Sequence, residues 1–174
     1  MLPELLNEQL RLVDGTIVKK CPTIKPLYCS KDGRFFSVCN MQITDNGCIM
    51  HELKPNDNPA STYAHKGGSA YPRMTHFGAR LCHHLIWETF VAPRTPGMEI
   101  DHINGNKMDW SLANLEEVTP TENRKRAKIL RAMRAAGNDP TNIPSAELKA
   151  IFARFELIDG TEQMSREISR HQEC

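Results

Sequence analysis

The stretch that decides how this chain folds is Glu99-Ile100-Asp101-His102-Ile103-Asn104-Gly105-Asn106-Lys107. Two isoleucines flank an acid and a histidine, which predicts a short strand, and the Asn-Gly pair that follows is a strong turn signal. A second strand is predicted over residues 115–118, Leu-Glu-Glu-Val. The region therefore predicts two short strands followed by a helix.

The start of that helix is well marked. Thr119 is a natural N-cap, Pro120 occupies the first helical position, and Glu122 stands three residues after the cap. Asn123 is therefore predicted in the first turn, facing back toward the strands. Gly137 is predicted to end the helix.

Four polar side chains are predicted to converge where a strand end meets this helix start: Asp101, His102, Asn114 and Asn123. Carboxylate and amide oxygens suit Mg²⁺ or Mn²⁺, and a neutral imidazole beside such an ion can take a proton from water. The set is sufficient for metal-assisted phosphodiester hydrolysis. An Asp-His pair is also found as a turn cap or a salt-bridged surface pair, which is the alternative.

One geometric difficulty accompanies this hypothesis. Neighbouring residues of a regular strand point to opposite faces, so Asp101 and His102 reach one phosphate only if the strand bends there. The Asn104-Gly105 pair directly afterwards makes such a bend the expectation.

Taken together, these residues resemble the ββα-metal motif of the HNH endonucleases, and most closely the phage-encoded HNH homing endonucleases. The resemblance rests on Asp101-His102, the Asn-Gly-Asn-Lys that follows, Asn114-Leu115 and the helix start through Asn123. It implies that His102 is the general base and that Asn114 holds His102 in orientation. It also implies one divalent ion, held by Asp101 and Asn123.

The last position of the motif departs from many HNH enzymes, which carry a histidine there. Asn123 at this position resembles the homing branch and favours Mg²⁺ or Mn²⁺ over softer metals. The expected function is metal-dependent DNA cleavage or nicking. The alternative, from a different class, is a DNA-binding or phage DNA-packaging accessory protein that keeps the fold without catalysis.

The distribution of charge points to nucleic acid as the partner, and the resemblance implies that this is double-stranded DNA. Net charge is only +1, yet residues 101–138 carry 7 basic and 5 acidic side chains while residues 139–174 carry 4 and 7. The helix after Asn123 has cations and no acid from position 124 to Gly137, which predicts a surface that tracks phosphates. A solvated helix face is the alternative. The predicted DNA-binding residues are Arg124, Lys125, Arg126, Lys128 and Arg131.

Cysteine spacing and hydropathy bear on zinc and on location. Cys21, Cys29, Cys39 and Cys48 are separated by 7, 9 and 8 residues, without the close pairs of structural zinc sites, so buried reduced thiols are expected and structural zinc is not. No apolar run approaches a membrane span and no secretory signal is recognisable. We therefore expect a cytoplasmic protein without a membrane partner.

The rest of the chain predicts an α+β fold. Leucines among residues 1–20 follow a nearly helical spacing, which predicts a docking helix that ends at Asp14-Gly15. Residues 21–55 predict two hairpins with turns at 31–33 and 45–47. That β region also loosely resembles a small module found before the motif in phage homing endonucleases. A loop at 56–70 precedes a strand at 71–79 and a helix at 80–90. The adjacent histidines His83 and His84 diverge on a helix, so packing is expected rather than chelation.

The predicted division is a β-rich module over 1–70, a ββα-metal core with its basic helix over 71–138, and a helical extension over 139–174. A helix beginning near Pro144-Ser145 has Leu148, Ile151, Phe152 and Phe155 on one side, and a second short helix is expected after Asp159. These two helices suggest either a helix-turn-helix or a segment that docks on the core or dimerises, and docking or dimerisation is favoured because the segment is acidic.

Overall fold

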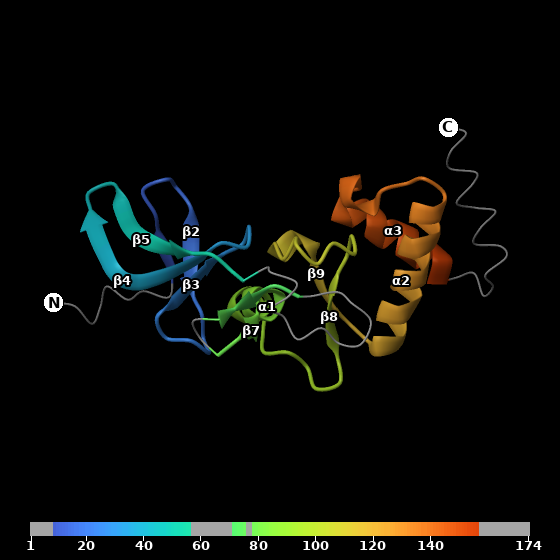
Figure 1. Ribbon diagram of the computed structural model, residues 1–174, viewed down its shortest axis with the longest axis horizontal. Helices are drawn as coiled ribbons and strands as arrows, with labels where there is room; N and C mark the ends of the chain where they lie inside the picture. Colours follow the sequence, from blue (N-terminus) through green and yellow to red (C-terminus); the bar gives the residue numbers. More distant parts are fainter. Residues whose placement is uncertain (1–8, 57–70, 76–77, 157–174) are drawn as a thin grey trace. The chain divides into compact units, whose positions relative to one another are not determined.

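The protein is described by a computed structural model that covers residues 9–56, 71–75 and 78–156 (Figure 1). The chain forms two compact units. The first consists of Met1–Arg94 and Lys107–Leu115, and the second of Thr95–Asn106 and Glu116–Cys174. The chain thus leaves the first unit, returns to it for nine residues, and leaves it again. A mixed α and β fold with a β-rich N-terminal half is confirmed.

The first unit is built on a five-stranded antiparallel sheet in the order β1-β2-β3-β4-β5. Tyr28 and Phe36 lie opposite each other on neighbouring strands, and both are buried with Val18. Leu12 bridges Cys48, so the sheet curls until its first and last strands meet. The strands are β1 (Gln9–Arg11), β2 (Ile17–Lys20), β3 (Leu27–Ser30), β4 (Phe35–Thr44) and β5 (Gly47–Leu53).

Both predicted hairpins of this sheet are confirmed, but the helix predicted to end at Asp14-Gly15 is wrong for the part that the structure describes. Leu10 and Leu12 lie two residues apart on β1 and its continuation, and both pack against the sheet core. A turn follows, in which Asp14 Oδ1 accepts from the Thr16 N–H at 2.9 Å. Pairing with β2 therefore overrides the helical spacing of the leucines. Leu2, Leu5 and Leu6 lie outside the described residues.

Residues 71–90 contain less strand than predicted. Two short strands, β6 (Arg73–Met74) and β7 (Arg80–Leu81), pair with each other, and helix α1 (Cys82–Phe90) follows directly. Leu85 and Ile86 of α1 are fully buried, as the predicted apolar stripe requires. His83 is buried as well and packs beside Tyr71 with ring centroids 5.3 Å apart, which confirms a packing role.

The predicted buried thiols are confirmed at Cys21, Cys29 and Cys48, whereas Cys39 is exposed on β4. All four are free. Cys39 departs from the prediction because it lies where the pairing of β4 with β5 shifts register after Ser37.

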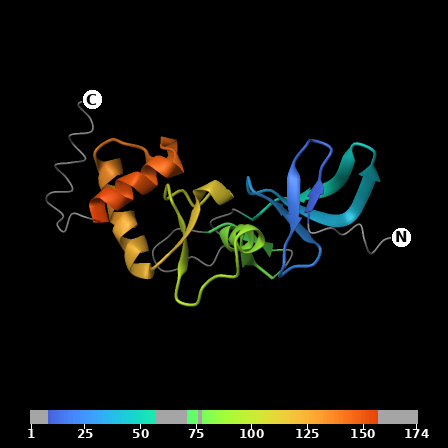
Figure 2. The ribbon, with the colours of Figure 1, turned by 180° about the vertical axis from the view of Figure 1, so that it is seen from behind.

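The second unit joins a two-stranded sheet to helices. Its core contains Ile103, Leu130, Met133, Leu148 and Phe152, so α3 packs against α2 and against the residue that follows β8. Figure 2 shows α3 lying across α2. The elements are β8 (Glu99–His102), β9 (Leu115–Val118), α2 (Pro120–Ala135), α3 (Ser145–Glu156) and the 3₁₀ helix η3 (Pro140–Asn142). The first strand residue of β9, Leu115, is the last residue of the first unit.

The compact units describe how the chain packs, and the division predicted at residues 70 and 138 stays a prediction. Residues 107–115 belong with the N-terminal strands, and α3 belongs with β8, most of β9 and α2 because its apolar face fills their core. That packing agrees with docking on the core. The second helix expected after Asp159 lies outside the described residues. None of the described helices is long and apolar enough to cross a membrane.

Candidate active site

Strands β8 and β9 pair with each other, and α2 begins two residues after β9. The helix start is as predicted: Thr119 caps it, and Thr119 Oγ1 accepts from the Glu122 N–H at 3.1 Å. Gly137 follows the helix with a φ of +85°, a conformation that glycine adopts without the cost paid by other residues. The element order is therefore strand, strand, helix, with the predicted residues at its junctions.

Asp101 lies on β8 with a side chain that is only 13% exposed. Its Oδ2 atom is buried and has no hydrogen-bond partner among the described residues, and Arg126 Nη1 approaches it only to 3.9 Å. Burial raises the pKa of Asp101 from 3.8 to about 6, although the positive charge of Arg126 acts in the opposite direction. A buried carboxylate oxygen without a donor is the kind of atom that a cation satisfies.

His102 is the last residue of β8 and is 4% exposed. Its backbone carbonyl accepts from the Gly105 N–H at 2.7 Å, so the chain turns immediately after the histidine. Gly105 has a φ of +68°, and a Cβ there would lie 2.9 Å from side-chain atoms of Arg134 and Leu130. The predicted bend is therefore present, but it begins at His102 and follows the strand rather than separating Asp101 from His102.

Asn123 lies in the first turn of α2, and its backbone N–H donates to Thr119 O at 2.9 Å. Its side-chain Nδ2 donates to Glu99 Oε2 at 2.7 Å. Because the amide nitrogen is turned to Glu99, the amide oxygen Oδ1 is the atom that remains for a metal ion.

Two side-chain contacts link β8 to α2, and they show which faces of the two elements lie toward each other. Glu99 and Asp101 share one face of β8 because side chains alternate along a strand. Asn123 and Arg126 are three residues apart and share one face of α2. Glu99 contacts Asn123 and Asp101 approaches Arg126, so the predicted metal ligands Asp101 and Asn123 come from facing sides of one strand–helix pair.

Asn114 ends the short 3₁₀ helix η2 (Leu112–Asn114) and directly precedes β9. It is 2% exposed, and its Nδ2 donates to the carbonyl of Asp109 at 2.7 Å. Asn114 belongs to the first unit, whereas His102 belongs to the second. This bond to the Asp109 backbone is local, and the orientation of His102 by Asn114 stays a prediction.

Arg126 differs from the other cations of α2 because its side chain is only 9% exposed. Its guanidinium contacts Glu116 at 2.5 Å and Glu122 at 2.6 Å, and it lies over the ring of Phe152, 5.0 Å from the centroid. The absence of acids from residues 124–137 predicts that Arg126 binds DNA, but acids from β9 and from the first turn of α2 reach it. Its role in this structure is internal ion pairing. The Glu122–Arg126 spacing of four residues is a sequence signal for part of this network.

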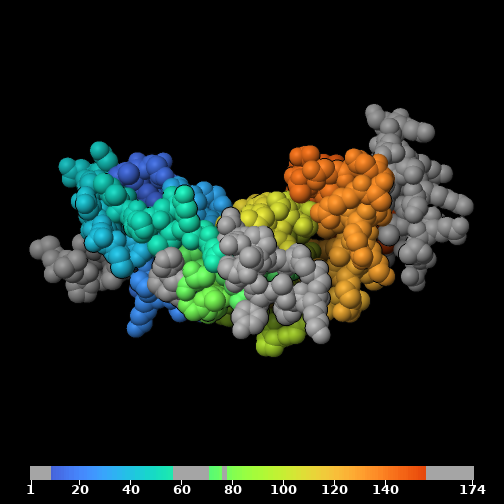
Figure 3. All heavy atoms as spheres, in the orientation of Figure 1, coloured from blue at the N-terminus to red at the C-terminus, as the bar shows by residue number. Residues whose placement is uncertain are grey.

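The other predicted DNA-binding residues are exposed. Arg124, Lys128 and Arg131 follow one face of α2 at helical spacing, opposite the buried residues, and Lys125 is exposed beside them. The surface of α2 is visible in the space-filling view (Figure 3). We call Arg124, Lys128 and Arg131 the α2 stripe.

The donor set bears on which metal the site suits. Among the described residues, no group of three or more His, Cys, Asp or Glu side chains is arranged to hold a metal ion. Asp101 and Asn123 would therefore supply two oxygens and leave other positions to water and phosphate, an arrangement that fits Mg²⁺ or Mn²⁺. The buried Oδ2 of Asp101 is the observation on which this fit rests.

Comparison with known proteins relates this segment to a class of nucleases. Residues 80–125 match a family described as HNH endonuclease, and the match contains Asp101, His102, Asn114 and Asn123. The resemblance read from the sequence is thereby confirmed. One relative is YosQ, a candidate HNH homing endonuclease derived from the SPbeta prophage of Bacillus subtilis (strain 168). It is 29% identical over 123 residues, which cover 68% of this chain and 70% of the relative. No solved structure matches the chain.

Proposed function

We propose that this protein is an endonuclease of HNH type that hydrolyses phosphodiester bonds in double-stranded DNA with one Mg²⁺ or Mn²⁺ ion. The single observation that carries the proposal is that the buried Oδ2 of Asp101 has no hydrogen-bond donor among the described residues. Asp101 directly precedes His102 in the chain, and His102 is buried as well. The family match over residues 80–125 supports the same reaction class.

Each residue of the site has one task in this proposal. Asp101 and Asn123 hold the ion through carboxylate and amide oxygens. The neutral imidazole of His102 accepts the proton of the attacking water as the general base. Asn114 orients His102; the support for this role is that Asn114 precedes β9, the partner strand of the one that ends at His102.

The metal ion is needed because phosphate hydrolysis builds negative charge. When bound, a divalent ion supplies Lewis-acid stabilisation of the charge that develops on the scissile phosphate and on the leaving 3′ oxygen. At neutral pH Asp101 is mostly ionised, since its pKa is about 6, so it can serve as an anionic ligand without losing a proton first.

The α2 stripe is the proposed contact with the DNA backbone. Its three cations are exposed, and the neighbouring Arg126 is occupied by acids of the fold. Contacts of this kind fix the position of DNA without reading its sequence. The relationship to YosQ supports a homing role in a phage context as part of the same proposal.

The deciding experiment is cleavage of supercoiled plasmid with Mg²⁺, with Mn²⁺ and with EDTA, beside a gel shift on the same DNA. The proposal expects nicked or linear product with either metal and none with EDTA. His102→Ala under identical conditions shows whether any product comes from this site. A gel shift without product in every metal would overturn the nuclease and favour the alternative, a DNA-binding or packaging accessory protein.

A further inference from the structure

The hydrogen bond between Asn123 Nδ2 and Glu99 Oε2, 2.7 Å long, has a consequence for which end of the Asn123 amide faces the metal site. An asparagine amide has a donor end and an acceptor end of nearly the same shape, so it can lie in either of two orientations. Only the oxygen end can bind a cation. A site that uses an asparagine as ligand therefore needs a partner that chooses the orientation.

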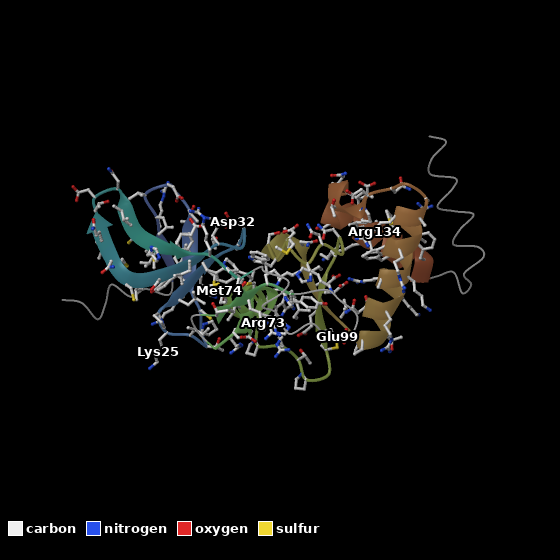
Figure 4. The ribbon with its side chains drawn as sticks, in the orientation of Figure 1. Lys25, Asp32, Arg73, Met74, Glu99 and Arg134 are labelled. Carbon is white, nitrogen blue, oxygen red and sulfur yellow. The ribbon has the colours of Figure 1, made fainter. Side chains whose placement is uncertain are left out.

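Glu99 has the chemistry to make that choice. An ionised carboxylate accepts hydrogen bonds and donates none, so it pairs with the amide nitrogen of Asn123 and excludes the amide oxygen. Charge on the acceptor also makes the bond stronger than one between neutral groups. Figure 4 shows Glu99 on β8, and in Figures 1 and 2 the start of this strand lies beside the first turn of α2.

The position of Glu99 suits this role for a second reason. It shares a face of β8 with Asp101, two residues further on, so the same strand presents one proposed ligand and the partner of the other. The backbone of Asn123 is held in the first turn of α2 by its bond to Thr119. The bond to Glu99 then restricts the side-chain torsions that set the direction of the amide.

We propose that Glu99 is a positioning residue, which holds the Asn123 amide with Oδ1 directed to the metal ion. The proposal rests on the proposed function, because it assumes that Asn123 is a ligand. Glu99 itself does not touch the ion; it acts through Asn123. Partners of this kind around metal ligands typically contribute about 10- to 100-fold to metal affinity.

The test measures Mn²⁺ affinity directly, by electron paramagnetic resonance of free and bound Mn²⁺ on the full chain, with plasmid cleavage alongside. Glu99→Gln keeps the shape but offers both a donor and an acceptor, so it no longer selects one amide orientation. We expect affinity to fall by about 10-fold. Glu117→Gln is the matched control, because Glu117 is an acid of β9 that bonds Thr95 instead, at 2.7 and 2.8 Å.

A double-mutant cycle separates positioning from the loss of one negative charge near the ion. Glu99→Gln is measured in the wild-type chain and in Asn123→Ala. If Glu99 acts through Asn123, its replacement has little further effect once the amide is gone. An equal loss in both backgrounds would show a general charge effect and overturn the positioning role.

The outcomes also distinguish the two proposals. A wild-type chain that neither binds Mn²⁺ nor cleaves DNA would overturn the proposed function and this inference with it. If the wild-type chain binds Mn²⁺ and cleaves DNA, but Glu99→Gln and Glu117→Gln have the same Mn²⁺ affinity, the inference about Glu99 is overturned and the proposed function stands. Thermal melts of the variants check folding; Glu99 is exposed, so its replacement should leave the fold intact.

Discussion

Trp110 donates its indole N–H to the backbone carbonyl of Gly33 at 2.7 Å, across 77 positions of sequence. A second bond, from Leu112 N–H to Lys31 O at 2.8 Å, lies beside it. The turn between β3 and β4 is thereby joined to the loop that separates β8 from β9. Gly33 has a φ of +93°, and a Cβ there would lie 2.8 Å from the Trp110 ring. The segment from Trp110 to Leu112 is therefore anchored on this turn within the first unit.

Trp110→Phe should lower the free energy of unfolding by about 1 kcal/mol, because the ring is largely kept while the Gly33 carbonyl loses its donor. Urea denaturation followed by circular dichroism measures this. Trp87→Phe, at the other tryptophan of the chain, is the matched control, because it removes an indole N–H from α1 instead. Equal stability of Trp110→Phe and wild type would mean that the anchor contributes nothing.

Asn114→Ala and Asn114→Asp should both destabilise the protein, and the aspartate variant should be the worse of the two. The amide of Asn114 donates to the Asp109 carbonyl from a site that is 2% exposed. Alanine leaves that acceptor without its donor, at a cost of about 1–3 kcal/mol, and a carboxylate adds repulsion against the carbonyl oxygen. Thermal melts above pH 7 rank the two, and a fully stable Asn114→Asp would contradict the observed bond.

His102→Ala should abolish cleavage while DNA binding persists. The loss of a general base typically costs about 10²- to 10⁴-fold in rate, and His102 does not belong to the α2 stripe. Single-turnover cleavage and a gel shift measure the two properties. His51→Ala, at an exposed position of β5, serves as the control. Near-normal turnover of His102→Ala would remove this residue from the mechanism.

Asp101 should make the metal-free protein less stable as pH rises. Its pKa is about 6 in the folded protein and 3.8 for a freely exposed aspartate, so the folded protein binds the proton more tightly than the unfolded chain. The stabilisation is fully present below about pH 4 and is lost as pH rises through about 6, and it amounts to at most about 3 kcal/mol.

Urea denaturation in EDTA between about pH 4 and 7.5 measures this dependence. Asp101→Asn removes the titrating group and should flatten the profile relative to wild type. The difference between the two proteins isolates Asp101 from the histidines that titrate in the same range. Parallel profiles would contradict a raised pKa.

Changing the α2 stripe, Arg124, Lys128 and Arg131, to glutamine should weaken binding to all DNA sequences alike. Each lost phosphate contact should reduce the slope of log affinity against log salt by roughly 0.9. Fluorescence anisotropy at several salt concentrations gives the slope.

A matched triple variant removes the same charge elsewhere. Lys25, Lys31 and Lys54 are exposed in the first unit, and changing them to glutamine should leave the slope unchanged if the stripe carries the contact. Lys25 is seen in Figure 4. An unchanged slope in the stripe variant, with a reduced slope in the control, would move the DNA contact to the first unit.

Elements defined by near neighbours were predictable from the sequence. The start of α2 depends on Thr119 and Pro120, and its end on Gly137, because capping and backbone preferences act over a few residues. The strand over 115–118 and the apolar face of α3 followed from short-range patterns, and the order of the motif residues led to the family that the comparison then matched.

Other features depend on partners that are distant in the sequence. The leucines of residues 9–12 form a strand instead of a helix because β2 and Cys48 offer pairing partners. Arg126 is buried, unlike the exposed cations of α2, because it pairs with Glu116 of β9 and packs on the ring of Phe152 of α3. A charged side chain is solvated or ion-paired depending on which segments pack beside it, and the helical spacing of the sequence does not specify those segments.

The sequence by itself therefore determined the residues of the candidate site and the helix that follows them. Only the tertiary structure decided that Glu99 bonds Asn123, that Asp101 has a buried oxygen beside Arg126, and that Trp110 ties the connecting loop to the sheet. The physical reason is the separation in sequence between the residues that interact. Caps and turns are fixed by bonds within a few positions, whereas burial and ion pairing are set by whichever segments folding brings together.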